Sequence, residues 1–502
     1  MSSARPLVVV SLPGRTVEEV RNEVVAAKAS GADAAEVRFD RWAPGERSRA
    51  RELFPAPIPL LATLRSHAEG GAGPDEPAER AGELLALARL PFQWIDLEAD
   101  RDLPLEPKLP PPSALGRIVS SHLPEGAPTP EIARRLRGDG PSDAIRKVVV
   151  MASVGALLRE ILPALPPPEE GARVLHTTGP SGALLRAWAA RLGFPLVYAR
   201  LPPTTDGPAA APIEASQIPA DRLRYFLDGG ASAPIFGIVG HPVAHSLSPY
   251  LHSRWMRGAG HRGLYVAFDI ASESEFVDCI PALVDGGFRG INVTHPWKQV
   301  AVATASRVGR GAEVCGVANC LTFRDDDVEA ENTDLVGILR RLEEYRRAGN
   351  WDGGELAVIG SGGAAAATLA AARELRATAF VIGRDPGRVV ALAEAFGATP
   401  LTEDQARPFS LVVHATTVGR GDSGPLAAPL RALIAAGGRV LDWVYSPVDR
   451  IVASTAEEAG ASYEDGWRLL VYQAAATFGV WWDSEPSSGA VATTLREGPC
   501  AE

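Results

Sequence analysis

The chain has 502 residues, 46% of them hydrophobic, and a formal net charge of −11. Its length suffices for about three domains. The acidic balance disfavours nucleic acid and anionic membrane as partners, because both attract basic patches. Cys279, Cys315, Cys320 and Cys500 lack metal-ligand spacing, and no run of 18 apolar residues occurs. These features predict a reduced, cytoplasmic protein that binds neither nucleic acid nor membrane.

Lysine is rare in this chain, whereas arginine is abundant. The four lysines are Lys28, Lys108, Lys147 and Lys298. Because arginine stays charged at any working pH, a lysine kept in such a chain can mark an amine that must lose its proton. Lys28 lies in an amphipathic helix pattern and Lys108 in a proline-rich loop, so both are expected at the surface. Lys147 and Lys298 are therefore candidates for chemistry, with chance as the alternative.

Eight short apolar runs follow one another in the first half. They are Leu7–Leu12, Ala35–Phe39, Pro59–Leu64, Trp94–Glu98, Arg117–Ser121, Lys147–Ala152, Arg173–Thr177 and Pro195–Ala199. Helical patterns separate several of them, as at 17–30 and 129–137. Strand alternating with helix in this way predicts a (β/α)8 barrel. An open doubly wound sheet is the alternative, although no glycine-rich fingerprint follows the first run.

Polar residues gather near the ends of these runs, where a barrel places its chemistry. They are Glu36, Arg38, Asp40, Arg65, Asp96, Glu98 and His122. Lys147 starts the sixth run, and an inward-facing lysine among valines would be desolvated and easier to deprotonate. Each residue taken alone is better explained by a salt bridge at the rim of the barrel. An amine, an imidazole, carboxylates and guanidinium groups together indicate a site for carbonyl chemistry.

The first 228 residues resemble type I 3-dehydroquinate dehydratase. The resemblance rests on five pieces of sequence: Glu36–Asp40, Thr63–Arg65 with Glu69–Gly71, Ser120–His122, Lys147 in its strand, and Gly179 to Arg186. It implies that Lys147 forms a Schiff base with the substrate ketone. His122 would remove the neighbouring proton and help to expel the hydroxyl as water, while Glu69 orients and polarises His122.

The same resemblance implies the substrate contacts of the barrel. Arg186 would bind the substrate carboxylate, and Glu36, Arg38 and Arg65 would grip the ring hydroxyls. The family's Ser-Ala-Pro-Gly-Gln lid is here Ile213 to Gln217. Only Gln217 is retained as a substrate-binding residue, and Ile213 replaces the lid serine. We expect this departure to affect the rate more than the chemistry.

The second half resembles shikimate dehydrogenase. Gly-x-Pro-x-x-His-Ser-x-Ser-Pro stands at 240–249, Asn-Val-Thr-x-Pro-x-Lys at 292–298, Gly-Val-Ala-Asn at 316–319, and Glu-Asn-Thr-Asp at 331–334. The resemblance implies that Lys298 and Asp334 are the catalytic pair that handles the proton at the reacting oxygen. A structural ion pair is the alternative. The implied substrate-binding residues are Ser246 and Ser248 for the carboxylate, Thr294, Asn319 and Gln473 for the hydroxyl side, and Tyr445.

A nucleotide-binding pattern follows. The strand pattern 355–359 leads into Gly360-Ser361-Gly362-Gly363-Ala364 and an alanine-rich helix, which is the unit that seats a pyrophosphate at a helix N-terminus. The implied cofactor-binding residues are Gly360, Gly362, Gly363, Ala364, Arg384, Arg388 and Thr416. The arginines suit a 2′-phosphate and favour NADP, whereas Asp385 leaves NAD as the alternative.

These patterns predict an α/β protein: an N-terminal (β/α)8 barrel followed by a two-domain shikimate dehydrogenase-like unit with a Rossmann domain. The expected ranges are 1–228 for the barrel, 229–234 for a linker, 235–336 plus 469–483 for the substrate-binding domain, 337–468 for the Rossmann domain, and 484–502 for a polar tail. The implied function is dehydration of 3-dehydroquinate to 3-dehydroshikimate and its reduction to shikimate with NADPH. The alternatives are an NAD-dependent quinate/shikimate dehydrogenase and a non-catalytic metabolite sensor.

Overall fold

The computed structural model describes residues 5–138, 140–203, 213–230, 232–325, 327–419, 429–445 and 449–499. Two compact units divide the chain. One comprises Met1–Gly237 with Gly260–Phe288, and the other Ile238–Ala259 with Arg289–Ala501. The division falls inside strand β9 (Ile235–Gly240), shortly after the linker expected at 229–234.

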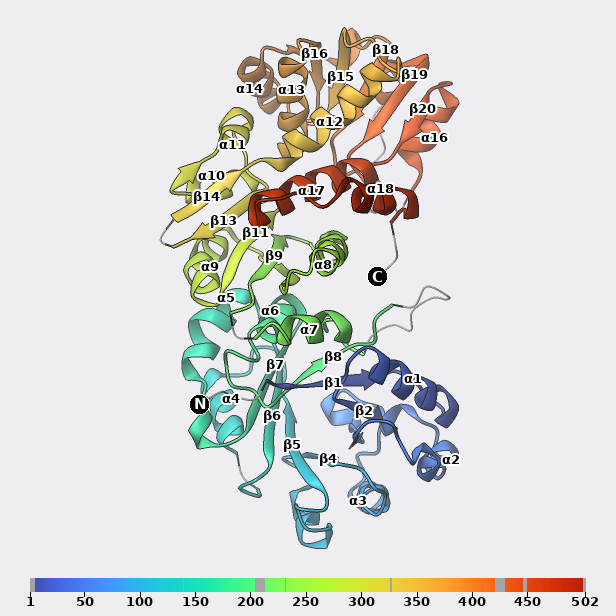
Figure 1. Cartoon of the computed structure of the whole chain (residues 1–502), viewed down its shortest axis with the longest axis vertical. Coiled ribbons are helices and arrows are strands. Elements are labelled where there is room, and N and C mark those ends of the chain that lie inside the picture. Colours follow the sequence, from blue (N-terminus) through green and yellow to red (C-terminus); the bar gives the residue numbers. More distant parts are fainter. Residues whose placement is uncertain are drawn as a thin grey trace. The chain divides into compact units, whose positions relative to one another are not determined.

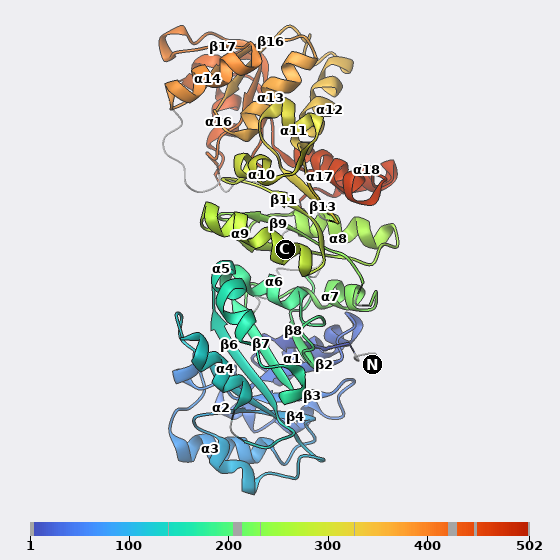
Figure 2. The ribbon, with the colours of Figure 1, turned by 90° about the vertical axis from the view of Figure 1, so that its left-hand side faces the viewer.

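Eight parallel strands form the first sheet, in the order β7-β6-β5-β4-β3-β2-β1-β8 (Figures 1 and 2). They are β1 (Leu7–Leu12), β2 (Ala34–Arg38), β3 (Leu60–Thr63), β4 (Trp94–Glu98), β5 (Gly116–His122), β6 (Ile145–Met151), β7 (Arg173–Thr178) and β8 (Leu196–Ala199). Strands that are neighbours in this order are also neighbours in sequence, apart from the first and last strands, β1 and β8, which pair with each other. The barrel prediction is confirmed, and the doubly wound alternative is wrong for this half.

Helices accompany the barrel strands: α1 (Val17–Ala29), α2 (Pro44–Arg47), α3 (Pro77–Leu87), α4 (Thr129–Arg137), α5 (Val154–Ala156), α6 (Gly182–Ala187) and α7 (Ala220–Leu227). Helix α1 begins with a capping box in which Thr16 and Glu19 satisfy each other's backbone N–H groups. The strands are buried on both faces, by core side chains and by helices, and many of their residues are apolar. Buried polar residues on these strands include Glu36 in β2, Asp96 in β4 and Lys147 in β6, which is 4% exposed.

The second sheet has the order β10-β9-β11-β13-β14-β12. Its remaining strands are β10 (Leu264–Asp269), β11 (Phe288–Val293), β12 (Arg307–Val308), β13 (Cys320–Arg324) and β14 (Asp327–Glu331). The helices from this stretch are α8 (Ser248–Gly258), α9 (Glu273–Asp285), α10 (Lys298–Thr304), α11 (Arg310–Cys315) and α12 (Thr333–Arg347). Helix α17 (Trp467–Trp482) packs against α12 and also against α8 and β13. Its assignment to the substrate-binding domain stays a prediction.

The third sheet is parallel, with the order β17-β16-β15-β18-β19-β20. Its strands are β15 (Glu355–Ile359), β16 (Thr378–Ile382), β17 (Thr399–Pro400), β18 (Phe409–His414), β19 (Ile434–Asp442) and β20 (Ser462–Glu464). The helices of this stretch are α13 (Gly363–Glu374), α14 (Pro386–Phe396), α15 (Pro429–Leu433) and α16 (Ile451–Glu458). This is the strand order of dinucleotide-binding folds, in which ligands bind where the order reverses, here between β15 and β18. The Rossmann prediction is confirmed.

Residues 484–502 differ from the expected polar tail. They include helix α18 (Ser488–Glu497), which begins at the N-cap Ser487. The indole of Trp255 donates to Thr494 Oγ1 at 3.3 Å, and Arg254 pairs with Glu497. Helix α18 therefore packs onto α8, and the packing depends on partners about 240 residues away that a local sequence pattern does not reveal.

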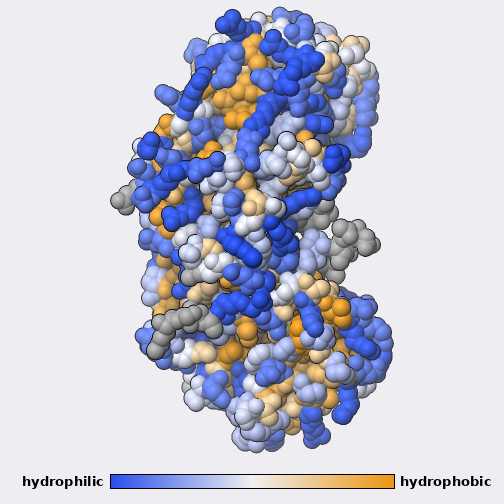
Figure 3. Space-filling view, in the orientation of Figure 1, coloured by the Kyte–Doolittle hydropathy of each residue, from blue (hydrophilic) through white to orange (hydrophobic). Residues whose placement is uncertain are grey.

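Hydrophilic side chains cover much of the face shown in Figure 3, with apolar residues between them. The large apolar side chains that are exposed lie on separate elements: Val25, Met151, Val277, Val308 and Val390. Within the described ranges, no helix is both long and apolar enough to cross a membrane.

Candidate active sites

Lys147 lies inside the barrel, on β6. Its Nζ atom donates to Asp96 Oδ2 at 2.8 Å and lies 3.3 Å from the Tyr198 hydroxyl and 3.9 Å from Glu36 Oε1. The sequence predicts Lys147 as the first residue of this strand. The strand begins at Ile145, however, so Lys147 is its third residue. The carboxylates come from β2 and β4 and the phenol from β8, so the barrel gathers them around one amine.

Arg65 ties the carboxylates near Lys147 into one network. Its guanidinium donates to Glu69 Oε2 at 2.7 Å, Asp96 Oδ1 at 3.0 Å and Glu98 Oε1 at 3.2 Å. Burial by itself would raise the pKa of Asp96, but the charges of Arg65 and Lys147 outweigh it and hold that pKa below its usual value. Asp96 is therefore a carboxylate that faces the Lys147 amine. Because Arg65 donates to three carboxylates, it can bind the substrate hydroxyls as expected only if it gives up one of these hydrogen bonds.

His122 and Glu69 form the expected pair. His122 Nδ1 lies 3.0 Å from Glu69 Oε2, and the backbone N–H of His122 donates to the same oxygen at 3.2 Å. Burial raises the pKa of Glu69 to about 7. Burial also lowers the pKa of His122 well below its usual value, so the imidazole is neutral near pH 7. With Nδ1–H donated to an ionised Glu69, Nε2 remains as the base.

The other expected substrate contacts of the barrel have protein partners. Glu36 accepts from Ser11 Oγ at 2.7 Å and from Thr63 Oγ1 at 2.9 Å. Arg38 donates to both carboxylate oxygens of Asp40, at 2.8 and 2.9 Å. Glu36 thus lies in the same cluster as Lys147, whereas Arg38 is bound to a carboxylate of its own chain segment.

Arg186 and the segment 213–217 meet at the same place. One Arg186 nitrogen lies 3.0 Å from Glu214 Oε2, and another donates to Ser216 Oγ at 2.9 Å. Gln217 Nε2 donates to Ser11 Oγ at 3.3 Å, which brings Gln217 beside the Glu36 cluster. Glu214 therefore holds the arginine that is expected to bind the substrate carboxylate. Sequence reasoning missed this contact, because Glu214 has no counterpart in the family's lid.

Lys298 and Asp334 form the expected pair in the second unit, with Nζ and Oδ2 2.5 Å apart. Lys298 opens α10, and Asp334 lies in the first turn of α12. Asn319 Nδ2 donates to Asp334 Oδ1 at 2.9 Å and lies 3.4 Å from Gln473 Oε1. The structure thus joins four of the expected residues. Ser246 and Ser248 lie together at the start of α8, with Ser248 N donating to Ser246 Oγ at 3.3 Å.

Three buried residues that sequence reasoning did not assign support Asn319. Asn292 Nδ2 donates to the Asn319 carbonyl oxygen at 2.9 Å and to Thr477 Oγ1 at 3.2 Å. Thr477 in turn lies 2.8 Å from Thr333 Oγ1, and the Thr333 backbone N–H donates to Asn319 Oδ1 at 2.7 Å. Asn292 belongs to the motif at 292–298, so that motif could have indicated it. Thr477, in an apolar helix, offers no such signal.

The remaining expected substrate residues lie elsewhere in the second unit. Thr294 directly follows β11, and its methyl group packs against Gly240, where an added Cβ would lie 2.3 Å from Thr294 Cγ2. Tyr445 follows β19 and is half-buried. Both positions are at strand ends, and their part in substrate binding stays a prediction.

The glycine-rich turn between β15 and α13 leaves room that a larger side chain would fill. Gly360 has φ +129°, and a Cβ there would lie 2.4 Å from the Ala415 carbonyl oxygen. Gly362 faces open space, and a Cβ at Gly363 would lie 3.0 Å from Lys298 Cδ. The turn therefore places a helix N-terminus next to the Lys298 side chain. Such an arrangement fits a dinucleotide, with its pyrophosphate on the α13 backbone N–H groups.

Asp385, which left NAD open, has a structural role. It is the N-cap of α14, and its Oδ1 accepts from the backbone N–H of Arg388 at 3.1 Å. The Arg388 side chain reaches the glycine-rich turn, where it lies 3.5 Å from the Ser361 carbonyl oxygen. Arg384 and Arg388 are both exposed at this edge, as a 2′-phosphate site requires.

His414, at the end of β18, forms a buried chain of contacts that sequence reasoning did not foresee. Its Nδ1 lies 2.8 Å from Asp442 Oδ1, and its Nε2 lies 2.7 Å from Thr416 Oγ1. Because Asp442 accepts from Nδ1–H, Nε2 accepts from the Thr416 hydroxyl. Thr416, an expected cofactor residue, then presents its oxygen as an acceptor, and Val418 N donates to it at 3.1 Å.

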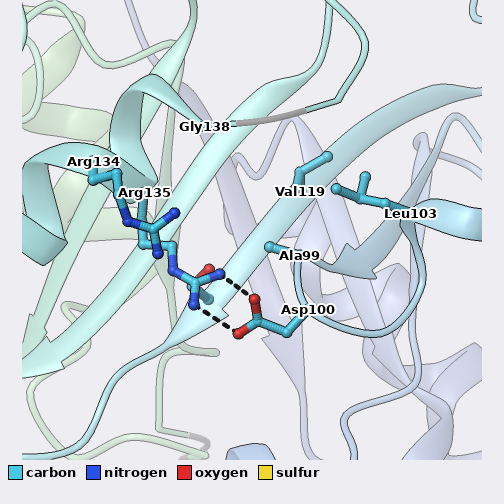
Figure 4. Close-up of a pocket in the computed structure, with 8 residues that line it drawn as sticks. Ala99, Asp100, Leu103, Val119, Arg134, Arg135 and Gly138 are labelled. Carbon is cyan, nitrogen blue, oxygen red and sulfur yellow. Dashed lines mark hydrogen bonds and ion pairs between the residues drawn. The ribbon is translucent and has the colours of Figure 1, made fainter.

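A small pocket in the barrel unit lies apart from these residues (Figure 4). It is lined by Ala99, Asp100, Leu103, Val119, Ser121, Arg134, Arg135 and Gly138. Arg135 donates to both carboxylate oxygens of Asp100, at 2.5 and 2.7 Å. This pocket contains none of the expected site residues, so we do not assign the chemistry to it.

Known proteins resemble both halves of the chain. Residues 8–228 match the family described as type I 3-dehydroquinase, and residues 238–321 match the shikimate dehydrogenase substrate binding domain. Shikimate dehydrogenase (NADP(+)) of Acidiphilium cryptum is 35% identical over 258 residues, which cover 51% of this chain and 92% of that protein. The enzyme of that name from Paracoccus denitrificans is 36% identical over 264 residues, covering 51% and 92%.

A solved structure, shikimate 5-dehydrogenase from Thermus thermophilus in complex with NADP(H) and shikimate, covers 53% of this chain and 99% of its own. The sequence identity is 32% and the TM-score 0.47. The relatives thus match along nearly their whole length to half of this chain, and the type I 3-dehydroquinase match occupies the other half. The chain belongs to the shikimate dehydrogenase family and carries a type I 3-dehydroquinase domain in front of it.

Proposed function

We propose that the chain is a bifunctional enzyme of the shikimate pathway. Its barrel dehydrates 3-dehydroquinate to 3-dehydroshikimate, and its second unit reduces that ketone to shikimate with NADPH. The observation that carries the proposal is the presence of two separate lysine sites in one chain. Lys147 lies among buried carboxylates in the barrel, and Lys298 pairs with Asp334 beside a glycine-rich turn. The product of the first site is the substrate of the second.

In the barrel, the Lys147 amine attacks the substrate ketone, and loss of water gives a protonated Schiff base. The Asp96 carboxylate, 2.8 Å from Nζ, stabilises this positive charge. The Schiff base acidifies the adjacent C–H bond, and His122 takes that proton on Nε2. His122 then returns the proton to the departing hydroxyl, which leaves as water. Hydrolysis of the Schiff base releases the product and restores the amine.

When the substrate binds in the barrel, arginines exchange protein carboxylates for substrate groups. Arg186 binds the substrate carboxylate, and Glu214 occupies the guanidinium when the substrate is absent. Arg65 and Glu36 orient the ring hydroxyls, and Gln217 closes over them beside Ser11. Arg38 joins them when it leaves Asp40.

When bound in the second unit, NADPH would supply the hydride for the ketone carbon. Lys298 and Asp334 deliver the proton to the ketone oxygen, and Asn319 holds Asp334 in place. Ser246 and Ser248 bind the substrate carboxylate, and Thr294, Asn319 and Gln473 contact its hydroxyl side. Tyr445 is a further substrate-binding residue. Gly360, Gly362, Gly363 and Ala364 would hold the pyrophosphate of the cofactor. Arg384 and Arg388 would hold its 2′-phosphate, and Thr416 would contact its nicotinamide half.

The proposed domain ranges are those expected from the sequence: 1–228, 229–234, 235–336 with 469–483, and 337–468. A cytoplasmic location is also part of the proposal, and cell fractionation tests it. The NAD-dependent alternative rested on Asp385, which caps α14. A non-catalytic metabolite sensor would be expected to have lost its catalytic residues. This chain keeps Lys147 and Lys298, and each of them pairs with a carboxylate.

A coupled assay tests the function. Purified protein receives 3-dehydroquinate and NADPH, and the loss of the nicotinamide absorbance is followed. Oxidation of NADPH from 3-dehydroquinate alone requires both activities. Oxidation only with added 3-dehydroshikimate would exclude the dehydratase, and Ile213 and Glu214 would be the first residues to restore to the family pattern. Reduction of NAD with shikimate or quinate, without NADPH oxidation, would replace the proposal by the catabolic alternative.

A further inference from the structure

His176, on β7, is a buried histidine to which the proposed mechanism gives no role. It is 3% exposed, and neither ring nitrogen has a hydrogen-bond partner among the residues that the structure describes. Buried polar side chains nearly always have partners, so an imidazole without one indicates a group that binds there. Arg186 Nε and Gln217 Oε1, which belong to the proposed site, are also buried and have no hydrogen-bond partner within the described ranges.

Strand pairing places His176 inside the barrel. In the parallel β6–β7 pair, Val174 lies opposite Lys147 and His176 opposite Val149. Paired residues, and residues two positions apart on a strand, point to the same face of a sheet. His176 therefore shares the face of Lys147 and lies one layer nearer the carboxyl ends of the strands, where barrels bind their ligands.

The neighbours of His176 connect it with both ends of the proposed site. Its ring packs edge-on against Tyr198, with centroids 5.2 Å apart at 87°, and the Tyr198 hydroxyl lies 3.3 Å from Lys147 Nζ. Arg186 donates to the carbonyl oxygen of Thr177, the next residue, at 3.1 Å. Burial lowers the pKa of His176 well below its usual value, and the charges of Arg186 and Lys147 lower it further. The neutral ring therefore offers one donor and one acceptor.

We propose that His176 is a further substrate-binding residue of the barrel. Its imidazole donates to the substrate carboxylate beside Arg186 and accepts a hydrogen bond from the hydroxyl on the same carbon. This inference rests on the proposed dehydratase function. The substrate, 3-dehydroquinate, carries a carboxylate and a hydroxyl on one carbon, and dehydration removes that hydroxyl. His176 thus distinguishes the substrate from the product.

Two variants of His176 separate binding from packing. His176→Phe keeps a ring against Tyr198 and removes both polar nitrogens, whereas His176→Gln keeps a donor and an acceptor. The dehydration kinetics and the inhibition constant of 3-dehydroshikimate are measured without NADPH. For His176→Phe we expect the KM for 3-dehydroquinate to rise about 10- to 100-fold, the loss typical of a hydrogen bond to a charged group. Product inhibition should weaken less, and His176→Gln should recover part of the affinity.

Two controls accompany these variants. Borohydride reduction at saturating substrate, followed by mass spectrometry of the Lys147 peptide, should still trap the Schiff base in His176→Phe. Leu175→Val changes the preceding residue, on the opposite face of β7, and should lower the melting temperature without changing KM.

An unchanged KM in His176→Phe, with a lowered melting temperature, would assign His176 to packing between β7 and β8 and overturn the inference. An equal loss of substrate and product affinity would overturn the assignment to the hydroxyl. A wild-type chain that does not dehydrate 3-dehydroquinate would overturn the proposed function itself, and that result is seen before any variant is made.

Discussion

In the barrel, the Lys147 side chain is 5% exposed and meets Asp96, Glu36 and Tyr198, whereas in the second unit the Lys298 side chain is 19% exposed and pairs with Asp334. In the proposed mechanism the barrel uses the Lys147 amine as a covalent catalyst, and a buried, charge-balanced environment would stabilise the intermediate. The second unit relies on a bound cofactor for the difficult step and needs only a proton donor and a frame of neutral hydrogen bonds. The lysine proposed to form a covalent intermediate is thus more deeply buried than the lysine proposed to transfer a proton.

The difference predicts that each lysine can be removed without harming the other reaction. Lys147→Met should lower the dehydration rate at least ~1000-fold, because the Schiff base needs an amine in the site and the other lysines of this unit, Lys28 and Lys108, are exposed. NADPH oxidation with 3-dehydroshikimate should be unchanged. The two rates are measured on one preparation, with Lys108→Met as the control at an exposed lysine. Loss of both activities in a folded Lys147→Met protein would contradict the independence of the sites.

Asp334→Asn tests the second unit in the same way. The carboxylate that holds Lys298 becomes an amide, so we expect ketone reduction to fall about 100- to 10,000-fold, the usual contribution of a positioned acid or base. Formation of the conjugated product from 3-dehydroquinate should continue at the wild-type rate. Asp404→Asn, at an exposed position, is the matched control. Reduction at more than a tenth of the normal rate would leave Lys298–Asp334 as a structural ion pair.

Cofactor choice sharpens the comparison, because it concerns the second unit alone. Arg388→Ala should raise the KM for NADPH about 10- to 100-fold through loss of a charged hydrogen bond to the 2′-phosphate. The KM for NADH should change little, since NADH lacks that phosphate. Arg373→Ala removes an exposed arginine from a neighbouring helix and should affect neither value. Equal losses with both cofactors would place Arg388 away from the phosphate.

A pH profile gives the smallest expected effect. Burial raises the pKa of Glu69 to about 7, so below that pH the carboxyl is protonated and no longer accepts the His122 Nδ1 proton. Dehydration should therefore rise about tenfold per pH unit up to pH ~7 and then level off. Glu69→Gln should be slow and should lack this rise. Ketone reduction in the same buffers is the control, and a rise that survives Glu69→Gln would assign the titration to another group.

Much of the fold follows from local sequence. Strands β1 and β4 begin and end where the apolar runs do, because parallel strands buried on both faces consist of such runs. The glycine-rich turn before α13 also follows from local sequence. Gly360 has a positive φ, a backbone conformation that most other residues avoid. The resemblances placed Lys147, His122, Glu69, Lys298 and Asp334. The structure pairs His122 with Glu69 and Lys298 with Asp334, and it gives Lys147 the partner Asp96.

Local sequence could not show which partners those residues have. Asp96 is 51 positions from Lys147 and Tyr198 is 51 positions beyond it, and only closure of the barrel brings both to one amine. The same holds for Glu214 on Arg186, for His176 beside Tyr198, and for α18 against Trp255.

The sequence by itself determined the alternation of strand and helix, the nucleotide-binding turn and the identity of the two lysines, because these depend on residue types at short spacing. The tertiary structure alone decided which carboxylate faces each amine, that Asp385 caps a helix, and which buried polar atoms lack a partner in the part of the chain that the structure describes. These properties depend on distances between segments far apart in the chain. The free energy of a buried charge is set by those distances and by the exclusion of water.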